Sequence, residues 1–304
     1  MTPIIFIYIN MNGSIQMRCF QIYEYISRKY KCEKICWEEQ EKINNLKNSI
    51  IFFFKHINTI ATVDFKRLKE RKNYLIFDTI DIKNPDIYKN FNHVFYKNFD
   101  FIITPLIYLK YLNKSNKKAR YIPHHYDIKL INYESNPEKV NKILFNGSIG
   151  YISKYENLLK NKVTFSLTFD NFTENLYEYS SYLYHISLYD EDIIDPRYKP
   201  ITKIATAAAL DSIIICENSE ENLYWLGEDY PFYINNNNKE TSIRKLLKKI
   251  VKNLISEDKI KMALKKMKIL KKELSLENII NKYYLKLIND VKKLRKKDRN
   301  ESQN

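Results

Sequence analysis

The feature of this sequence that most restricts its fold is a repeated alternation of continuous apolar runs and amphipathic segments. The apolar runs, such as IIFIYI from Ile4 and IIFFF from Ile50, contain no charged residue. Strands buried on both faces of a parallel sheet have this composition, whereas strands with one wet face alternate. The segments between the runs carry apolar residues at helical spacing, as at Ile15, Cys19 and Ile22. The pattern predicts an α/β protein with parallel sheets.

The alternation occurs twice, and a polar stretch without a sustained period separates the two series. Predicted strands are 4–9, 33–37, 50–55, 74–77, 101–104 and 120–123, then 143–146, 163–168, 185–189, 212–216 and 232–234. Predicted helices are 15–30, 38–47, 60–72, 106–113, 155–160, 174–181, 201–210 and 220–226. The chain is also predicted to be helical from 240 to near 295, with breaks around Ser256 and Ser275. We therefore expect two Rossmann-like, doubly wound domains facing a cleft. Their expected ranges are 1–125 and 141–238, with a linker at 126–140 and basic helices at 239–304 packing back on the domains.

The positive charge is concentrated at the C-terminal end of the sequence. Residues 239–304 contain 21 Lys and Arg against 8 Asp and Glu, which accounts for +13 of the net charge of +15. A solvated helical face explains this, and so does attraction to an anionic membrane surface. Nucleic acid is a third partner class for such charge, but none of its common binding motifs is found, so no nucleic acid is expected.

Targeting signals and cysteine spacing bear on the compartment. No apolar run approaches the ~18 residues of a membrane-spanning helix, and the first residues lack the basic leader of a signal peptide. The four cysteines form no CxxC pair and are expected to be reduced packing residues. We expect a cytoplasmic protein, peripheral on the inner membrane face if its basic helices bind lipid.

Glycine is scarce in this sequence, and its positions are informative. Gly13, followed by Ser14, and Gly147, followed by Ser148, both lie between the first predicted strand and the first helix of a domain. A glycine there lets the backbone approach a ligand, and the following helix start favours an anion. Neither loop matches the dinucleotide pattern GxGxxG. A simple tight turn is the alternative explanation for each glycine.

A third helix start lies in the segment DPRYKPITKIATAAALDSIIIC, residues 195–216. Pro200 suits the first turn of a helix, so Thr202 and Lys203 are predicted to offer free backbone donors. Arg197, Lys199 and Lys203 add positive charge around them. The segment is thus predicted to hold a diphosphate, the alternative being a packed helix with a solvated basic start.

Several segments in the same order resemble the group 1 type of GT-B glycosyltransferases. They are YLIFDTID, FDFIITPLIYLKYL and ARYIPHHYD in the first series, then ILFNGSIGYISKYENLL, RYKPITKIATAAALDSIII and ENLYWLGEDYPFYI in the second. The resemblance implies transfer of a sugar, a hexose in most such enzymes, from a UDP- or GDP-sugar to a glycan or lipid-linked acceptor. It implies no metal and no other cofactor, and it matches Lys203 to the lysine of a family motif.

The sequence departs from this family at two positions. Retaining members carry two glutamates eight positions apart, where this chain has Arg197 and Ala205. The stereochemistry therefore stays open. Glu217, just beyond a predicted strand, is a candidate for a polar contact to the donor sugar or its ribose.

An inverting enzyme needs a base, and three residues are candidates. Asp78 and Asp81 follow a predicted strand, and His124 follows another. Asp81 is equally suited to cap a helix or turn, and a histidine is often structural. The acidic stretch Asp190–Asp192 is interpreted as a solvated turn, so no metal site is predicted.

Three functional hypotheses follow. The first is a glycosyltransferase that acts on surface glycans. The second is a non-catalytic GT-B-like module that binds a nucleotide-sugar or a partner, which the missing glutamate pair favours. The third is another GT-B enzyme, such as a nucleotide-sugar epimerase, although such enzymes carry more catalytic acids and histidines than this chain.

Overall fold

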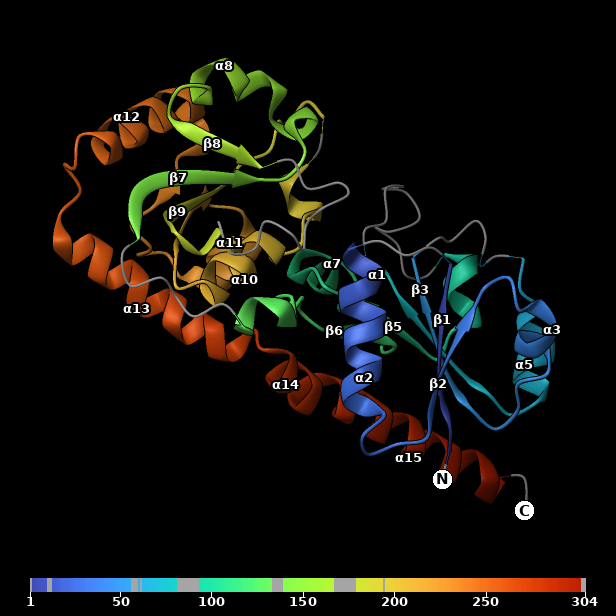
Figure 1. Ribbon diagram of the computed structural model, residues 1–304. Helices are drawn as coiled ribbons and strands as arrows, with labels where there is room; N and C mark the ends of the chain where they lie inside the picture. Colours follow the sequence, from blue (N-terminus) through green and yellow to red (C-terminus); the bar gives the residue numbers. More distant parts are fainter. Residues whose placement is uncertain are drawn as a thin grey trace. The chain divides into compact units, whose positions relative to one another are not determined.

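The structure is a computed structural model, and it describes residues 2–9, 13–55, 60, 62–80, 93–132, 139–166, 179–193 and 195–301. The chain forms two compact units (Figure 1). Unit 1 consists of Met1–Pro123 together with Leu276–Asn304, and unit 2 consists of His124–Ser275. The C-terminal segment therefore belongs to the same unit as the N-terminus.

Unit 1 is built on a six-stranded parallel sheet in the order β2-β1-β3-β4-β5-β6. Its strands are β1 Ile4–Tyr8, β2 Cys32–Cys36, β3 Ile50–Phe54, β4 Tyr74–Asp78, β5 Phe101–Thr104 and β6 Ala119–Tyr121. Ile5 pairs with Glu33 on one side and with Ile51 on the other. All residues of β3, β4 and β5 are buried, as expected for continuous apolar runs.

The helical elements of unit 1 are shorter than predicted, and the first is irregular. It consists of α1 Gly13–Ile15, the π-helical η1 Gln16–Gln21 and α2 Ile22–Ile26. The other described helical elements before Pro123 are α3 Gln40–Asn44, α5 Phe65–Glu70, η2 Val94–Asn98 and α7 Ile107–Leu112. π-Helical turns inside α-helices are rare and are frequently found at functional sites, and here the turn contains the fully buried Arg18.

The C-terminal helices complete the core of unit 1. They are α14 Leu276–Ile279, the π-helical η7 Ile280–Tyr284 and α15 Leu285–Glu301. Their inner side is buried and consists of Ile279, Ile280, Tyr284, Leu287, Ile288 and Val291. The Tyr74 hydroxyl donates to Asp298 over 2.7 Å, and Figure 1 shows α15 beside the N-terminal strands.

Unit 2 repeats this topology with five parallel strands in the order β11-β10-β9-β7-β8. The strands are β7 Val140–Asn146, β8 Val163–Ser166, β9 Tyr182–Ser187, β10 Ile213–Glu217 and β11 Tyr233–Ile234. In each unit the first strand lies between the second and the third, so the direction of winding reverses beside it. Ligands of such sheets bind beyond the carboxyl ends of the strands at this switch point.

Helices and short helical turns connect the strands of unit 2. They are η3 Ile128–Asn132, η4 Ile149–Tyr155, α8 Glu156–Leu159, η5 Pro196–Tyr198, α10 Thr202–Ala209, α11 Glu220–Leu226 and η6 Asn236–Asn238, followed by α12 Lys239–Val251 and α13 Glu257–Glu273. The predicted helix at 174–181 lies largely outside the described residues. Four alanines of α10 are buried, and their small side chains let this helix lie close to the sheet and α13.

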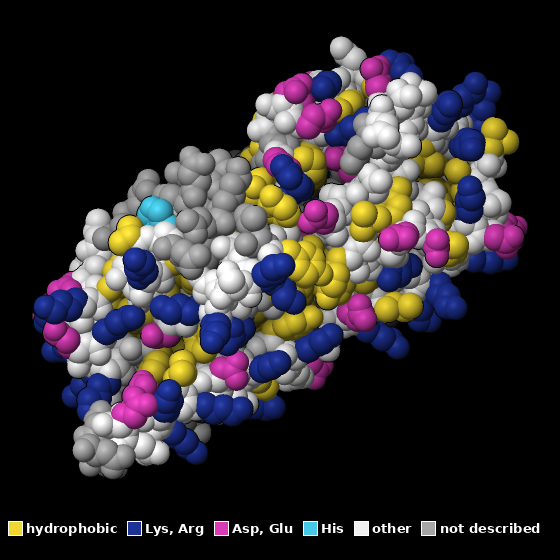
Figure 2. All heavy atoms as spheres, turned by 180° about the vertical axis from the view of Figure 1, so that it is seen from behind, with side chains coloured by type: hydrophobic (Ala, Val, Ile, Leu, Met, Phe, Trp, Pro, Cys, Tyr) yellow, Lys and Arg dark blue, Asp and Glu magenta, His cyan; other side chains and the backbone are white. Residues whose placement is uncertain are grey.

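Two Rossmann-like parallel-sheet units with a helical C-terminal segment confirm the predicted fold class. None of the described helices is long and apolar enough to cross a bilayer. On the face that Figure 2 shows, Lys and Arg side chains are spread over both units, with Asp and Glu among them.

Candidate functional site

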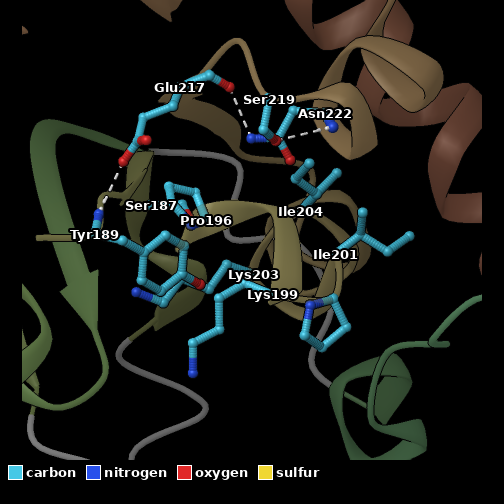
Figure 3. A pocket seen from close by; sticks show the side chains of 11 residues that line it. Ser187, Tyr189, Pro196, Lys199, Ile201, Lys203, Ile204, Glu217, Ser219 and Asn222 are labelled. Atoms are coloured by element: carbon cyan, nitrogen blue, oxygen red, sulfur yellow. Dashed lines mark hydrogen bonds between the residues drawn. The ribbon is translucent and has the colours of Figure 1, made fainter. Parts of the chain in front are cut away.

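A small pocket lies at the carboxyl ends of β9 and β10 in unit 2, next to the start of α10 (Figure 3). Its lining residues are Ser187, Tyr189, Pro196, Lys199, Pro200, Ile201, Lys203, Ile204, Glu217, Ser219 and Asn222. The pocket is thus beside the switch point of the second sheet, where this topology places ligands. Lys199, Lys203 and Glu217 were predicted as site residues, and the structure brings these three together.

Lys203 extends from the first turn of α10 to the loop after β7. Its Nζ lies 4.2 Å from the centre of the Phe145 ring and 5.0 Å from that of Tyr189. A Cβ atom on Gly147 would come within 3.3 Å of this Nζ, and the φ of Gly147 is +153°. A glycine is therefore favoured at 147 both by its backbone conformation and by the approach of the lysine.

No described residue forms an ion pair that would neutralise the charge of Lys203. Its contacts are the faces of aromatic rings. Removal from water and, to a smaller extent, the nearby Lys199 lower the pKa of Lys203 to about 7, although Glu217 opposes the shift. An anion bound here would supply the missing partner and favour the charged ammonium.

Lys199 and the start of α10 add to the positive character of this pocket. The Nζ of Lys199 lies 4.3 Å from the centre of the Tyr151 ring and 5.8 Å from that of Tyr189. No side chain caps the start of α10, where the backbone of Ile201 precedes Thr202. The first backbone N–H groups of a helix lack internal acceptors and carry partial positive charge. Two lysines and a helix start therefore favour an anion in this pocket.

Glu217 and Lys239 hold the loop that carries Tyr189. The Glu217 carboxylate accepts the Tyr189 N–H over 2.9 Å and pairs with Lys239 over 3.0 Å. Lys239 also donates to the Tyr189 carbonyl over 2.6 Å and to Glu191 over 2.8 Å. Burial raises the pKa of Glu217, although Lys239 acts in the opposite direction. In the described structure Glu217 therefore positions the aromatic ring next to both lysines of the pocket.

Three other predicted residues lie near the pocket without lining it. Arg197 is half-exposed, and its guanidinium pairs with Asp195 over 2.6 Å. Thr202 is half-buried at the first position of α10. Ser148 precedes η4 and makes no capping hydrogen bond there. Ala205, at the second family glutamate position, is fully buried in α10.

The predicted residues Gly13, Ser14 and Asp78 belong to unit 1. Gly13 is exposed at the start of α1, and a Cβ there would meet nothing within 4 Å. Asp78 is fully buried and pairs with Arg18 over 2.7 Å. Arg18 also donates to the carbonyls of Ile122 and Pro123 over 3.2 and 2.9 Å. A carboxylate held in this way favours a structural role over that of a base, because a base must reach its substrate.

The remaining catalytic candidates are Asp81 and His124. Asp81 lies outside the described residues. His124 is 2% exposed, and its Nδ1 lies 2.8 Å from the carbonyl oxygen of His125. Its burial likewise favours a structural role, so a base for this chain stays a prediction.

Sequence reasoning missed three residues that shape these sites. Tyr189 was predicted only as the last residue of a strand, and Lys239 was counted only as part of a basic helix. Arg18 carried a signal, because it lies three residues after Ile15 and four before Ile22 on the apolar side of its helix. A charged residue at such a position needs a buried partner, and the structure supplies Asp78.

The acidic stretch after β9 is engaged by the protein itself. Asp190 accepts from the Ser153 hydroxyl and the Lys154 N–H, and Lys154 pairs with Glu191 and Asp192. Within the described ranges, no group of three or more His, Cys, Asp and Glu residues is arranged to hold a metal ion.

Comparisons with known proteins identify the fold. No family model and no curated protein matches the sequence. A glycosyltransferase from Rickettsia africae is similar in structure, with a TM-score of 0.66, 11% identity, and coverage of 95% of this chain and 98% of that one. AviGT4, a glycosyltransferase involved in avilamycin A biosynthesis, has a TM-score of 0.59 at 9% identity and coverage of 94% and 96%.

A third similar structure is the pneumococcal O-GlcNAc transferase GtfA, in complex with UDP and GlcNAc. Its TM-score is 0.57 at 11% identity, and the alignment covers 84% of this chain but 59% of GtfA. At such low identities the comparisons establish the fold, and this chain has the GT-B fold.

Proposed function

We propose that this chain is a glycosyltransferase that uses a nucleoside-diphosphate sugar as donor. The observation that carries the proposal is Lys203, which lies beside the switch point of the second sheet with no carboxylate partner among the described residues. Its Nζ lies so close to Gly147 that a Cβ atom at this position would be only 3.3 Å from it. Glu217 lines the same pocket but pairs with Lys239, so the diphosphate of a donor would supply the ion-pair partner that Lys203 lacks among the described residues. GT-B glycosyltransferase structures, one of them with bound UDP, share the fold.

The chemistry requires stabilisation of a departing diphosphate. The bond between the anomeric carbon and the diphosphate oxygen breaks, a bond to an acceptor hydroxyl oxygen forms, and the hydroxyl proton passes to a base. Lys203, Lys199 and the first amides of α10 would stabilise the charge that develops on the leaving oxygen. We propose that these groups act without a metal, that the sugar is a hexose and that the acceptor is a glycan or lipid-linked sugar, as the sequence resemblance implies.

Nucleotide binding tests the pocket. Titration calorimetry with UDP and GDP should show binding of one of them, and Lys203→Ala should weaken it about 10- to 100-fold, since hydrogen bonds to charged groups contribute ~1.5–3 kcal/mol. Gly147→Ala should also weaken it, because the added methyl displaces the lysine. Gly150→Ala is the matched control, since its Cβ would meet only Ser148 Oγ at 3.6 Å. Equal affinity of the wild type and Lys203→Ala would contradict the proposed site.

A non-catalytic nucleotide-sugar-binding module is the second candidate. It is favoured by the absence of glutamates at two positions where the family has them. Arg197, at the first position, pairs with Asp195, and Ala205, at the second, is fully buried. Release of UDP or GDP from a panel of nucleotide sugars, with and without glycan acceptors, separates the two. Binding without hydrolysis or transfer on any combination would support the module and rule out the enzyme.

We also propose that the protein works in the cytoplasm. All four cysteines are free thiols, which suits a reducing compartment.

A further inference from the structure

Unit 2 also contains a larger groove. It lies near the amino end of β9, whereas the pocket described above lies at the carboxyl end of this strand. The groove has a volume of about 1060 Å³ and is lined by Tyr126, Lys139, Leu183, Asp211, Ile260, Leu264, Lys268, Lys271, Lys272 and Ser275. Leu183 is the second residue of β9, whereas the pocket residue Ser187 is its last. Because a strand rises ~3.3 Å per residue, the two sites are separated by more than ~10 Å along the sheet.

The groove combines an apolar wall with a cationic rim. Leu183, Ile260 and Leu264 contribute apolar surface, and the rim is formed largely by lysines of α13. Lys271 pairs with Asp211 over 2.6 Å. In contrast, Lys268 and Lys272 are exposed and form no ion pair with any other described residue. Such a groove suits a ligand with a negatively charged head and an apolar body.

The outer face of α13 continues this chemistry. The helix contains seven lysines against three acidic residues, so positive charge dominates its surface. Met262 and Ile269, seven residues apart and hence on one side of the helix, are 47% and 45% exposed. Leu254, in the turn before α13, is 64% exposed. Exposed apolar residues beside a lysine-rich helical face are typical of helices that lie in a membrane interface.

We propose that α13 and its groove dock unit 2 onto a bilayer containing anionic phospholipids. Lys268 and Lys272 bind lipid phosphates at the rim of the groove, while Met262, Ile269 and Leu254 enter the headgroup region. Each basic residue near an anionic surface adds attraction, and exposed apolar residues add burial. This proposal does not depend on the donor chemistry, because the groove and the pocket consist of different residues and lie at opposite ends of β9.

Vesicle flotation of the full chain tests the surface. Vesicles of phosphatidylcholine and phosphatidylglycerol should carry the protein, and vesicles of phosphatidylcholine alone should carry far less. The double variant Lys268→Glu/Lys272→Glu should weaken partitioning at least about tenfold. The matched control, Lys248→Glu/Lys249→Glu, makes the same charge change with two exposed lysines near the end of α12 and should weaken it less than about threefold.

Further experiments distinguish binding to a bilayer from binding to other anions. Met262→Ser/Ile269→Ser should reduce the binding that persists at high salt, because this variant keeps every charge. Inorganic phosphate at constant ionic strength should not displace the vesicles. Equal losses in both lysine pairs, displacement by phosphate, or binding of a DNA duplex in place of vesicles would overturn the proposal. Circular dichroism and nucleotide titration of each variant verify that it is folded.

Discussion

At the scale of the residue, Lys203 has an unusual environment for a lysine. Its ammonium is surrounded by aromatic rings and a glycine, where a surface lysine would meet water or a carboxylate. Burial without a partner disfavours the charged form, which is why its pKa falls to about 7. The protein maintains this unfavourable arrangement next to a helix start, and a bound diphosphate would relieve it.

This arrangement predicts a pH dependence for nucleotide binding. A bound diphosphate favours the ammonium, so binding takes up a proton once the pH exceeds the free pKa of about 7. UDP or GDP affinity should therefore fall by up to about tenfold per pH unit above 7, where the phosphate, with a pKa near ~6, is already ionised. Titrations from pH 6.5 to 9 measure this.

Lys203→Ala provides the reference for that experiment, because the slope should disappear in this variant. A slope unchanged by the substitution would assign the titration to another group.

The same lysine also affects the pH dependence of folding stability. The unfolded chain binds a proton that the folded protein releases above pH 7, so this group makes the fold more stable as pH rises from about 7 towards the unfolded pKa.

At the scale of the element, two π-helical segments of unit 1 meet at one buried ion pair. η1 contains Arg18, η7 contains Tyr284, and the Arg18 guanidinium carbon lies 5.7 Å from the centre of the Tyr284 ring. The guanidinium also links β4 to the chain after β6, through Asp78 and two backbone carbonyls. Local departures from the α-helix thus coincide with a long-range connection.

We expect Arg18→Met to destabilise unit 1 by about 3–5 kcal/mol, because it leaves the Asp78 carboxylate buried without its partner. The double variant Arg18→Met/Asp78→Leu should regain much of this loss, since replacement of a buried pair by apolar residues is often neutral. Urea unfolding followed by circular dichroism measures both. A single variant as stable as the wild type would show that Asp78 does not require Arg18, and would reopen a functional role for this carboxylate.

At the scale of the whole molecule, the C-terminal segment belongs to the unit that contains the N-terminus. Seven residues of 276–291 are buried in unit 1, and Arg295 donates to the Asn48 carbonyl over 3.3 Å. The lysine-rich helices α12 and α13 belong to unit 2 instead. The basic C-terminal region is therefore divided between two cores.

A chain that ends at Ser275 should lose the fold of unit 1 selectively. It lacks the apolar side of η7 and α15, so the sheet of unit 1 would expose residues that they cover, such as Phe52, whose ring centre lies 6.2 Å from that of Tyr284. Hydrogen exchange should show lost protection in β1 and β3 and retained protection in β9 and β10. Equal protection in both sheets would contradict this division.

Much of the fold could be predicted from sequence, because parallel strands buried on both faces must be continuous apolar runs. The ten strands predicted from 4–9 to 212–216 are found, although their ends differ, and the strand predicted at 232–234 is found at Tyr233–Ile234. The site was predicted in part. Lys203, Lys199 and Glu217 line one pocket, whereas Asp78 and His124 are buried and Asp81 lies outside the described residues.

The sequence by itself determined the α/β class, the two series of strands and the helix start that contains Lys203, because these depend on local composition and spacing. Only the tertiary structure decided which charges are satisfied. Arg18 pairs with Asp78, which lies sixty residues away in the sequence, and Lys239 pairs with Glu217. Lys203 contacts aromatic rings and forms no ion pair with a carboxylate among the described residues. Partners of this kind come from different strands and loops, and their meeting depends on sheet order, which no local pattern encodes.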